Sequence, residues 1–526
     1  MTRYAIVADL NRCVGCQTCT AACKHANATA PGIQWRKVLD FEAGEFPDVT
    51  RAFLPVGCMH CDNPPCMEVC PTTATRKRDD GIVTIDYDKC IGCAYCAVAC
   101  PYQARFRVDK PAMAYGRGQV MPHEPMQEDP GRIGVAQKCS LCIDRIDDGL
   151  ARGLVPGVDP GATPACVNSC ISGALSMGDI DEENSNVSTL LRENRHFRMH
   201  EDLGTGPGIY YLYDRETACL DESGPPVMVA DPAGLAAVSP RLQANWDWRA
   251  AANFTFGGAG TGLFAVTVIA GLFAPLLWLA ALLALTLVGA GLFCVWLEIG
   301  RPMRFLNVFL NPWTSWMSRE ALAALPFFAF GGAFLLWPVP TLGLLGGASG
   351  LVFVYCQGQI LRAAKGIPAW RQPGIVPLIM TTGLTEGVAL FIIVAVLAGY
   401  DALMLQTVGL GLLVLVGLRA ALWQIYRGAL GAAGAPVAAL RELDAGVLTL
   451  SAKVQAVVLA CVVAGLFTPA ILALAGVLTL ATGWGFKFRL ITRAAFNQGF
   501  AINRMPARGA GKSAPGIKPG WVASRL

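Results

Sequence analysis

The pattern of apolar and polar residues divides the chain near residue 250. Charged residues are frequent before that point, and long apolar runs follow it. A helix needs about 20 largely apolar residues to cross a bilayer. Glycine-rich stretches within the runs, "FGGAGTG" and "LLGGASG", favour close helix packing in lipid. The runs predict eight membrane-spanning helices, at 254–274, 276–298, 320–338, 340–362, 375–399, 402–426, 449–469 and 470–486.

Lysines and arginines predict how this bundle is oriented. If residue 250 lies inside, all the basic loop residues lie inside, and the outside turns near "FAP", "WPVP", "GYDA" and "TPA" have none. Because basic loops stay in the cytoplasm, we expect both termini to face it. The opening "MTRYAIVADLNRC" predicts a short strand and has no secretory signal. The front half should therefore stay on the side where it is made.

Composition agrees with a soluble front half and a membrane back half. Charged residues make up 15% of the chain, against about 25% in soluble domains. The net charge of +4 gives no reason to expect a nucleic-acid partner. We expect an α+β front domain, followed by an all-α bundle of eight transmembrane helices. The predicted boundaries are 1–180 for the front domain, 181–250 for a closing segment and linker, 251–490 for the membrane anchor, and 491–526 for a basic cytoplasmic tail.

Sixteen of the twenty cysteines fall into four groups in the first 170 residues. The first and third groups have the C-x2-C-x2-C-x3-C spacing that bacterial ferredoxins use for [4Fe–4S] clusters. The second group has a longer step before its third cysteine, and an insertion splits the fourth group. Disulfides do not suit reduced cytoplasmic thiols, and structural zinc usually takes two C-x2-C pairs for each ion. The spacing favours iron–sulfur clusters, with zinc as the main alternative.

Sixteen thiolates supply four ligands to each of four [4Fe–4S] clusters. In two-cluster ferredoxins the fourth cysteine of a run binds the neighbouring cluster. Nesting the second and third runs inside the first and fourth then predicts four ligand sets, which we name sites I to IV. Site I is Cys13, Cys16, Cys19 and Cys170; site II is Cys23, Cys139, Cys142 and Cys166; site III is Cys58, Cys61, Cys66 and Cys100; site IV is Cys70, Cys90, Cys93 and Cys96. Four clusters favour electron transfer over a purely structural role, and we expect residues 1–180 to form an α+β ferredoxin-like domain that binds them.

The histidines limit what the clusters can exchange electrons with in the membrane. All five lie at or before residue 200, and a membrane haem b needs imidazole ligands. We therefore expect no haem, and a quinone (menaquinone or ubiquinone) as the membrane redox partner.

The loop between the second and third predicted spans is the candidate quinone site. Quinone chemistry couples electrons to protons, so a carboxylate near the carbonyl oxygens is expected, and arginines can stabilise developing negative charge. The alternative is an ordinary loop whose arginines only set the topology. The candidate residues are Glu298, Arg301, Arg304, Trp316, Arg319 and Glu320.

Two further ionisable residues fall inside predicted spans. Glu386 lies near the middle of the fifth span, and Arg419 lies at comparable depth on the sixth. Charged residues inside a membrane are costly and are often functional. A structural ion pair and a proton path are both open interpretations of this pair.

The four cysteine runs resemble the electron-transfer subunit of complex iron–sulfur molybdoenzymes, such as dimethyl sulfoxide reductase and polysulfide reductase. This resemblance covers about residues 1–180, and "LGTGPGIYYLYD" near 203–214 resembles the segment that closes that subunit. The back half is similar to the eight-span quinone-binding anchor of the same enzymes, through its span count and the G-R-P…S-W-x-S-R-E pattern at 300–320. In the family these are usually separate chains, and here they are fused.

The resemblance implies a molybdopterin catalytic subunit as partner, with no catalytic residue on this chain. It places the site III and site IV clusters nearest the membrane. It also matches Glu320 to a quinol-site glutamate, while Glu298 stands where that family has a histidine. A fused chain with a cytoplasmic cluster domain is most similar to sulfite:quinone or acyl-CoA:quinone oxidoreductases.

Two other functions compete with this one. The first is an ion-translocating redox module that uses Glu386 and Arg419 as a proton path. The second is a self-sufficient enzyme, which the lack of a molybdopterin-, flavin- or nucleotide-binding glycine motif argues against.

Overall fold

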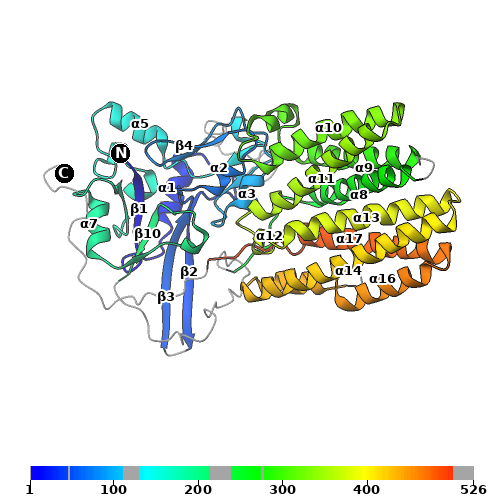
Figure 1. The fold of residues 1–526 in the computed structure, drawn as a ribbon. Helices are drawn as coiled ribbons and strands as arrows, with labels where there is room; N and C mark the ends of the chain where they lie inside the picture. The colour runs from blue at the N-terminus through cyan, green and yellow to red at the C-terminus, as the bar shows by residue number, and fades with distance from the viewer. Residues whose placement is uncertain are drawn as a thin grey trace, which may run out of the picture.

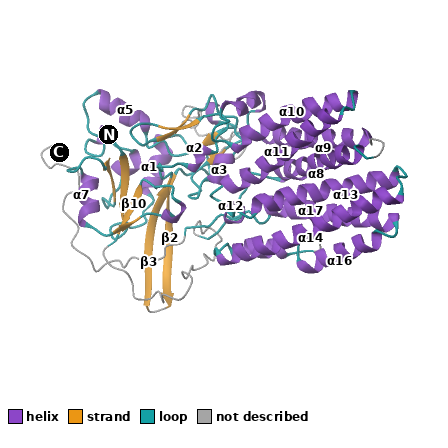
Figure 2. Ribbon diagram, viewed as in Figure 1, coloured by secondary structure: helices purple, strands orange, loops and turns teal. Residues whose placement is uncertain are grey.

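The computed structural model describes residues 2–45, 48–110, 130–213, 239–273, 278–446 and 448–500. An α+β half holds the four cysteine groups, and a helical half extends from one side of it (Figure 1, Figure 2). Part of the predicted linker, 214–238, and the predicted tail from residue 501 lie outside the described residues.

A small four-stranded sheet organises the α+β half, with the order β8-β1-β10-β9. The predicted first strand is confirmed as β1 (Tyr4–Asp9), whose side chains are mostly buried. β1 pairs antiparallel with β8 (Leu175–Asp179) and parallel with β10 (Ile209–Leu212), and β9 (His196–Phe197) pairs with β10. The sheet therefore joins the first residues of the chain to the segment after the last cysteine group.

Three two-stranded ribbons complete the β structure of the described residues. The longest, β2 (Arg36–Glu45) with β3 (Asp48–Gly57), projects away from the rest of the α+β half (Figure 1). The others pair β4 (Thr75–Lys77) with β5 (Val83–Ile85), and β6 (Phe106–Arg107) with β7 (Ala136–Gln137).

Short helices follow the cysteine loops. α1 (Thr18–Ala26) and α3 (Tyr95–Ala99) each begin after a residue with positive φ, Gln17 and Ala94 respectively. Such left-handed residues let a loop curl tightly before the helix starts. The remaining described helices of this half are α2 (Pro65–Glu68), α5 (Ile143–Ala151), α6 (Ala165–Asn168) and α7 (Asn186–Glu193).

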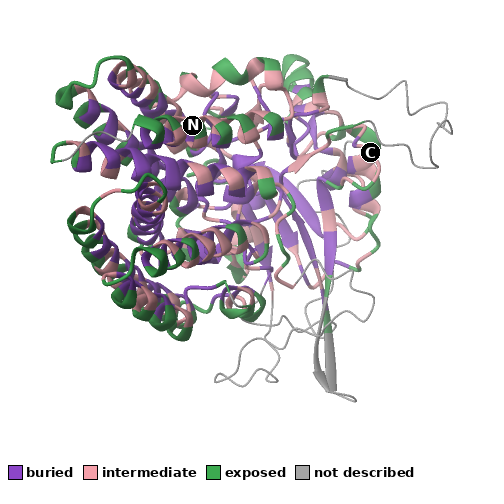
Figure 3. Cartoon of the chain, turned by 90° about the vertical axis from the view of Figure 1, so that its right-hand side faces the viewer, coloured by how far each residue is buried: buried purple, intermediate pink, exposed green. Residues whose placement is uncertain are grey.

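Seven described helices of the second half are long and apolar enough to cross a membrane. Their outward faces are apolar: Val414 and Ile425 on α14 are 69% and 66% exposed, as suits contact with lipid. Figure 3 shows buried residues gathered where the helices face one another. The seven are α8 (Trp248–Gly271), α9 (Trp278–Glu298), α10 (Trp316–Leu336), α11 (Pro340–Ala363), α13 (Ile375–Leu397), α14 (Ala402–Ala432) and α17 (Pro469–Thr492).

The predicted span 449–469 is a shorter helix in the structure. α16 (Ala452–Gly465) has 14 residues, fewer than the ~20 that cross a bilayer at full thickness. The eight-span count is therefore not confirmed. The helical half also contains the short helices α12 (Pro368–Arg371) and α15 (Val437–Asp444) and the 3₁₀ segment η4 (Pro302–Leu310).

Glycines bring α8 and α13 into backbone contact. A Cβ on Gly262 would lie 2.4 Å from the carbonyl oxygen of Gly383, so α8 does not tolerate a side chain there. This confirms the close packing that "FGGAGTG" predicts.

The two halves are locked together by a second set of glycines. The Gly300 amide, just after α9, donates to the Gly92 carbonyl at 3.3 Å. A Cβ on Gly300 would lie 2.1 Å from the carbonyl oxygen of Gly134. Gly92 and Gly134 belong to the α+β half, and both have positive φ. This contact holds the loop around Cys90 and Cys93 against the end of α9.

Candidate functional site

The fold brings cysteines from distant runs close to one another. The thiols close enough to Cys61 to interact with it electrostatically include that of Cys100, from the next run. Cys93 has Cys70 as such a neighbour, together with Cys90 and Cys96 of its own run. These neighbours correspond to sites III and IV.

The outer runs meet in the same way. Cys19 lies near Cys13 of its own run and Cys170 of the last run, both of site I, and also near Cys166 of site II. The thiols that act on Cys23 are those of Cys139, Cys142 and Cys166. The four ligand sets remain predictions, but each contains cysteines that the fold places side by side.

The chemistry around the cysteines fits iron–sulfur clusters. Most of these cysteines are buried, and thiolates gathered in a protein interior would repel one another unless metal or cationic side chains balanced their charge. Three buried cations lie among them: Arg36, Arg105 and Lys138, which are 1%, 5% and 2% exposed. None of the three guanidinium nitrogens of Arg36 has a hydrogen-bond partner in the described protein, so they are available to cluster sulfur atoms.

The two ends of the cysteine array differ in their surroundings. Cys16 of site I is exposed, and the nearby Val14 and Ile171 are 49% and 72% exposed. At the other end, Cys70, Cys90 and Cys96 pack in the same hydrophobic core as residues of the helical half. Site IV therefore lies against the membrane half, and site I lies at the surface of the α+β half.

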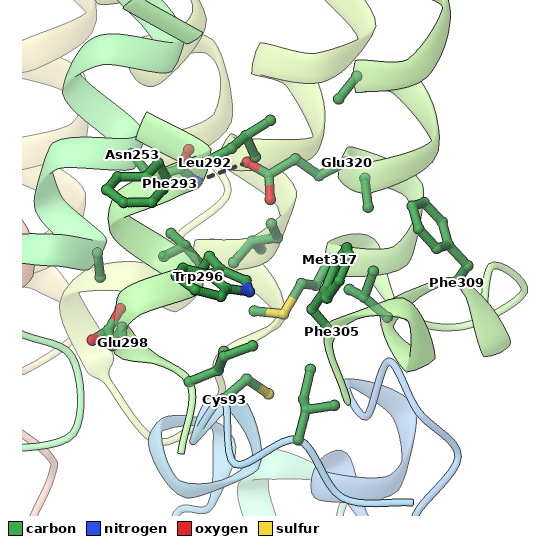
Figure 4. Close-up of a pocket in the computed structure, with 18 of the residues that line it drawn as sticks. Cys93, Asn253, Leu292, Phe293, Trp296, Glu298, Phe305, Phe309, Met317 and Glu320 are labelled. Atoms are coloured by element: carbon green, nitrogen blue, oxygen red, sulfur yellow. Dashed lines mark hydrogen bonds between the residues drawn. The ribbon is translucent and has the colours of Figure 1, made fainter. Parts of the chain in front are cut away.

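A cavity of about 370 Å³ lies between Cys93 of site IV and the ends of α9 and α10. Cys93 lines one end, and Glu320 from α10 and Glu298 from α9 line other walls (Figure 4). Asn253 of α8 donates to Oε1 of Glu320 at 3.1 Å, while the Asp247 amide donates to Oε1 of Glu298 at 3.2 Å. The remaining wall is largely apolar, with Trp296, Phe305, Phe309 and Met317 prominent. The cavity suits a flat ring with polar atoms at its edge.

The other four predicted quinone residues do not line this cavity. Arg301 Nε donates to the Ile133 carbonyl at 2.8 Å, and Arg304 donates to the carbonyls of Tyr87 and Cys90 at 2.7 and 3.3 Å. Both arginines thus bind the backbone of the α+β half. Arg319 binds the carbonyls of Pro312 and Trp313 and lies over the Trp316 ring at 4.2 Å, bracing its own loop.

Polar side chains of the same loop hold the site IV cysteine loops. Asn311 donates to the Cys70 carbonyl at 2.8 Å, and Ser315 donates to the Val69 carbonyl at 2.8 Å. Asn307 reaches the Lys89 carbonyl at 3.2 Å. The loop that the sequence suggested for quinone binding is therefore mainly a clamp on the site IV backbone, and its two terminal glutamates face the cavity.

Glu386 has a different ion-pair partner from the one expected. Lys487 of α17 donates to Glu386 Oε2 at 2.6 Å, and both side chains are fully buried. Arg419 lies near Glu386 but donates instead to Gln455 Oε1 at 2.9 Å and Thr482 Oγ1 at 3.2 Å. In the sequence Lys487 directly follows the last predicted span, 470–486, so it counts there only as a basic residue of the cytoplasmic end.

Sequence reasoning missed several residues around the cavity and site IV. Asn253 could not be identified from the sequence, because a single amide beside an apolar run is common. Trp246 donates from Nε1 to the Cys93 carbonyl at 3.0 Å and stacks on Trp370, whereas its sequence position indicated only an interfacial aromatic. Tyr95 joins the halves through its hydroxyl, which donates to the Ile360 carbonyl at 2.8 Å.

Comparison with known proteins adds two family matches and a set of relatives. The model described as a 4Fe-4S dicluster domain matches residues 49–116, and the model described as the DMSO reductase anchor subunit (DmsC) matches residues 275–475. The second match begins just before α9 and ends within α17.

Several curated relatives match about two fifths of the chain. A subunit of the selenate reductase of Mesobacillus selenatarsenatis is 40% identical over 226 residues, which are 40% of this chain and 72% of that protein. A putative dimethyl sulfoxide reductase iron-sulfur subunit of Halobacterium salinarum is 38% identical, over 40% of this chain and 79% of that one. A subunit of the sulfite dehydrogenase of Allochromatium vinosum is 36% identical, over 41% and 85%.

Proposed function

We propose that this chain relays electrons through four [4Fe–4S] clusters between a molybdopterin subunit and a membrane quinone. The chain belongs to the family of iron–sulfur subunits of dimethyl sulfoxide reductase-like oxidoreductases, and it carries the matching membrane anchor in the same polypeptide. The chain is an oxidoreductase subunit whose catalytic chemistry takes place on a partner. One observation carries the quinone proposal: Cys93 of site IV and Glu320 line the same cavity.

In this proposal each part of the chain has a defined role. The bound clusters supply one-electron carriers. The cavity's apolar walls hold the quinone ring and exclude water, and Glu320 and Glu298 exchange protons with its two oxygens. Asn253 fixes the Glu320 carboxylate through Oε1. Trp246 and the clamp loop hold Cys93 at the cavity wall.

At the opposite end, the surface around site I suits a partner subunit. Cys16 is exposed there, as are the apolar side chains of Val14 and Ile171, which neighbour the site I residues Cys13 and Cys170 in the sequence. The substrate is set by that partner, because relatives of similar identity to this chain are named for selenate, sulfite and tetrathionate enzymes. Sulfite oxidation remains a prediction from the resemblance.

The orientation is likewise proposed. Arg362, Lys365, Arg427 and Arg441 lie in segments at the cluster-domain end of the helices, away from the clamp loop. Because these residues do not serve that contact, their position supports a cytoplasmic cluster domain through the positive-inside rule. We propose that the short helix α16 is an eighth membrane span, crossing the bilayer where it is locally thinner.

The test uses the purified complex with reduced benzyl viologen as electron donor and a soluble quinone as acceptor. We expect Glu320→Gln to slow quinone reduction by roughly 100-fold, the lower range for loss of an acid–base group, with the cluster spectra unchanged. Glu193→Gln on the exposed end of α7 is the matched control and should retain full activity. Unchanged turnover in the Glu320→Gln variant would remove this cavity as the quinone site.

A further inference from the structure

The three buried cations of the α+β half stand at the junctions between the ligand sites. Arg36, the first residue of β2, lies beside Cys19 of site I and beside Cys139 and Cys166 of site II. It is 1% exposed, and its guanidinium nitrogens have no hydrogen-bond partner in the described protein. An unpaired guanidinium in an interior is strongly unfavourable, so its surroundings must hold compensating negative charge.

Arg105 occupies the corresponding position between sites III and IV. Its guanidinium donates to Sγ of Cys66 at 2.9 Å and to Oγ1 of Thr75 at 3.0 Å. It also lies close enough to the thiol of Cys96 of site IV to interact with it electrostatically. One side chain thus contacts ligands of two different sites.

Lys138 occupies the middle junction, between sites II and III. Its Nζ donates to the Cys139 carbonyl at 2.7 Å and to the Val83 carbonyl. The site III thiols that interact with it are those of Cys58 and Cys66. The cations therefore connect the sites in the order I, II, III, IV, which runs from the exposed Cys16 to the cavity.

We propose that Arg36, Lys138 and Arg105 are redox-tuning residues, and that each raises the reduction potential of the two clusters beside it. The proposal rests on the four-cluster function above and goes beyond it by assigning residues that do not ligate iron. A cluster that accepts one electron gains one negative charge, with no bond made or broken. A nearby cation stabilises that reduced state, and the effect is large because the interior screens charge poorly.

The cations can also act through hydrogen bonds, because hydrogen bonds to cluster sulfur change the reduction potential of a cluster. Arginine is suited to this role since it remains charged and carries five donors in a fixed fork. A cation at a junction acts on both neighbours, so the potentials of adjacent clusters move together. The difference in reduction potential between adjacent clusters then stays small, so electrons can pass between them in either direction.

The test is a potentiometric titration followed by electron paramagnetic resonance, on purified full-length protein with its iron content measured. We expect Arg36→Gln to lower the reduction potentials of sites I and II and to leave those of sites III and IV unchanged. We expect Arg105→Gln to lower the potentials of sites III and IV and to leave those of sites I and II unchanged. The expected loss is at least tenfold in the equilibrium constant for electron uptake, which is about 59 mV for a one-electron couple. Arg36→Lys, which keeps the charge, should retain most of the wild-type potential.

A second variant addresses the case in which a glutamine variant does not assemble its clusters. Thr75→Asp would place a carboxylate against the Arg105 guanidinium and cancel its charge while the arginine stays in place, and Thr75→Val is the control. Potentials that do not move in fully loaded Thr75→Asp protein would overturn the proposal. Wild-type protein with iron for fewer than four clusters would instead overturn the proposed function, so the two failures can be told apart.

Discussion

Lys487 on α17 and Glu386 on α13 form an ion pair 2.6 Å long, and neither side chain has any solvent exposure. Breaking a buried pair strands the remaining charge, at a cost of about 3–5 kcal/mol. We expect Lys487→Met alone to lower the melting temperature of the detergent-solubilised protein sharply. The double variant Glu386→Gln/Lys487→Met should be nearer wild type, because it removes both charges of the pair, while Arg419 keeps its hydrogen bonds to Gln455 and Thr482. A double variant as unstable as the single one would contradict a purely structural pair.

Gly300 makes a second contact whose geometry leaves little freedom. A methyl group there would lie 2.1 Å from the Gly134 carbonyl oxygen, so Gly300→Ala should force the α+β half away from α9. We expect at least a roughly tenfold loss of quinone reduction at unchanged iron content, since site IV would move from the cavity. Gly332→Ala on α10 is the control, because nothing lies within 4 Å of that position. Full activity in Gly300→Ala protein would show that the contact does not set the relay distance.

How much of this arrangement the sequence could predict depended on how local each signal was. Cysteine spacing is local, so the four groups could be read from the sequence directly, whereas their crossed assignment to clusters stays a prediction. Spans such as 375–399 were close to α13 because an apolar run records burial in lipid directly. The span 449–469 was overestimated, since residues 449–451 and 466–469 are apolar or small but fall outside α16.

Contacts between segments far apart in the chain could not be predicted from the sequence in this way. Arg301 and Arg304 seemed suited to a quinone, yet they bind backbone carbonyls at Ile133 and Tyr87, and a carbonyl acceptor has no side-chain identity to read. Lys487 pairs with a residue 101 positions away. Only the packing of α13 against α17 brings the two together, and helix order in a bundle is not encoded in hydropathy.

Exposure of Cys16 predicts that the clusters can be removed in a definite order. The cysteines of sites II to IV are buried or half-buried, whereas site I has one ligand exposed at the surface. On treatment with ferricyanide and a strong iron chelator, we expect the site I signal to disappear first. The Cys16→Ser variant identifies that signal. Loss of all iron in a single phase would mean that access to site I is no easier than to the others.

His200 predicts a pH dependence of stability. Its ring packs near Tyr102 and Phe500, and Nε2 lies 3.0 Å from the Gly499 carbonyl. Burial lowers the pKa of His200, with Arg371 adding to this, while Gly499 and Asp202 oppose it. The unfolded chain therefore binds the proton more readily than the folded one, so stability falls as pH drops through about 6.5. His200→Gln should flatten the decrease in melting temperature between about pH 7.5 and about pH 5.5. An unchanged slope would mean that groups other than His200 cause the decrease in melting temperature.

The basic residues predict which side of the membrane holds the cluster domain. In the described structure, Arg362, Lys365, Arg427 and Arg441 lie towards the α+β half, and the turn Gly399–Tyr400 at the other end carries no basic residue. The positive-inside rule then predicts that the α+β half lies in the cytoplasm. Green fluorescent protein fused after residue 526 should fluoresce, and alkaline phosphatase fused at the same point should be inactive. The matched fusion within the turn after Gly399 should give the opposite pair of results. Active phosphatase at the C-terminal position would invert the orientation, and with it the side on which the catalytic partner must bind.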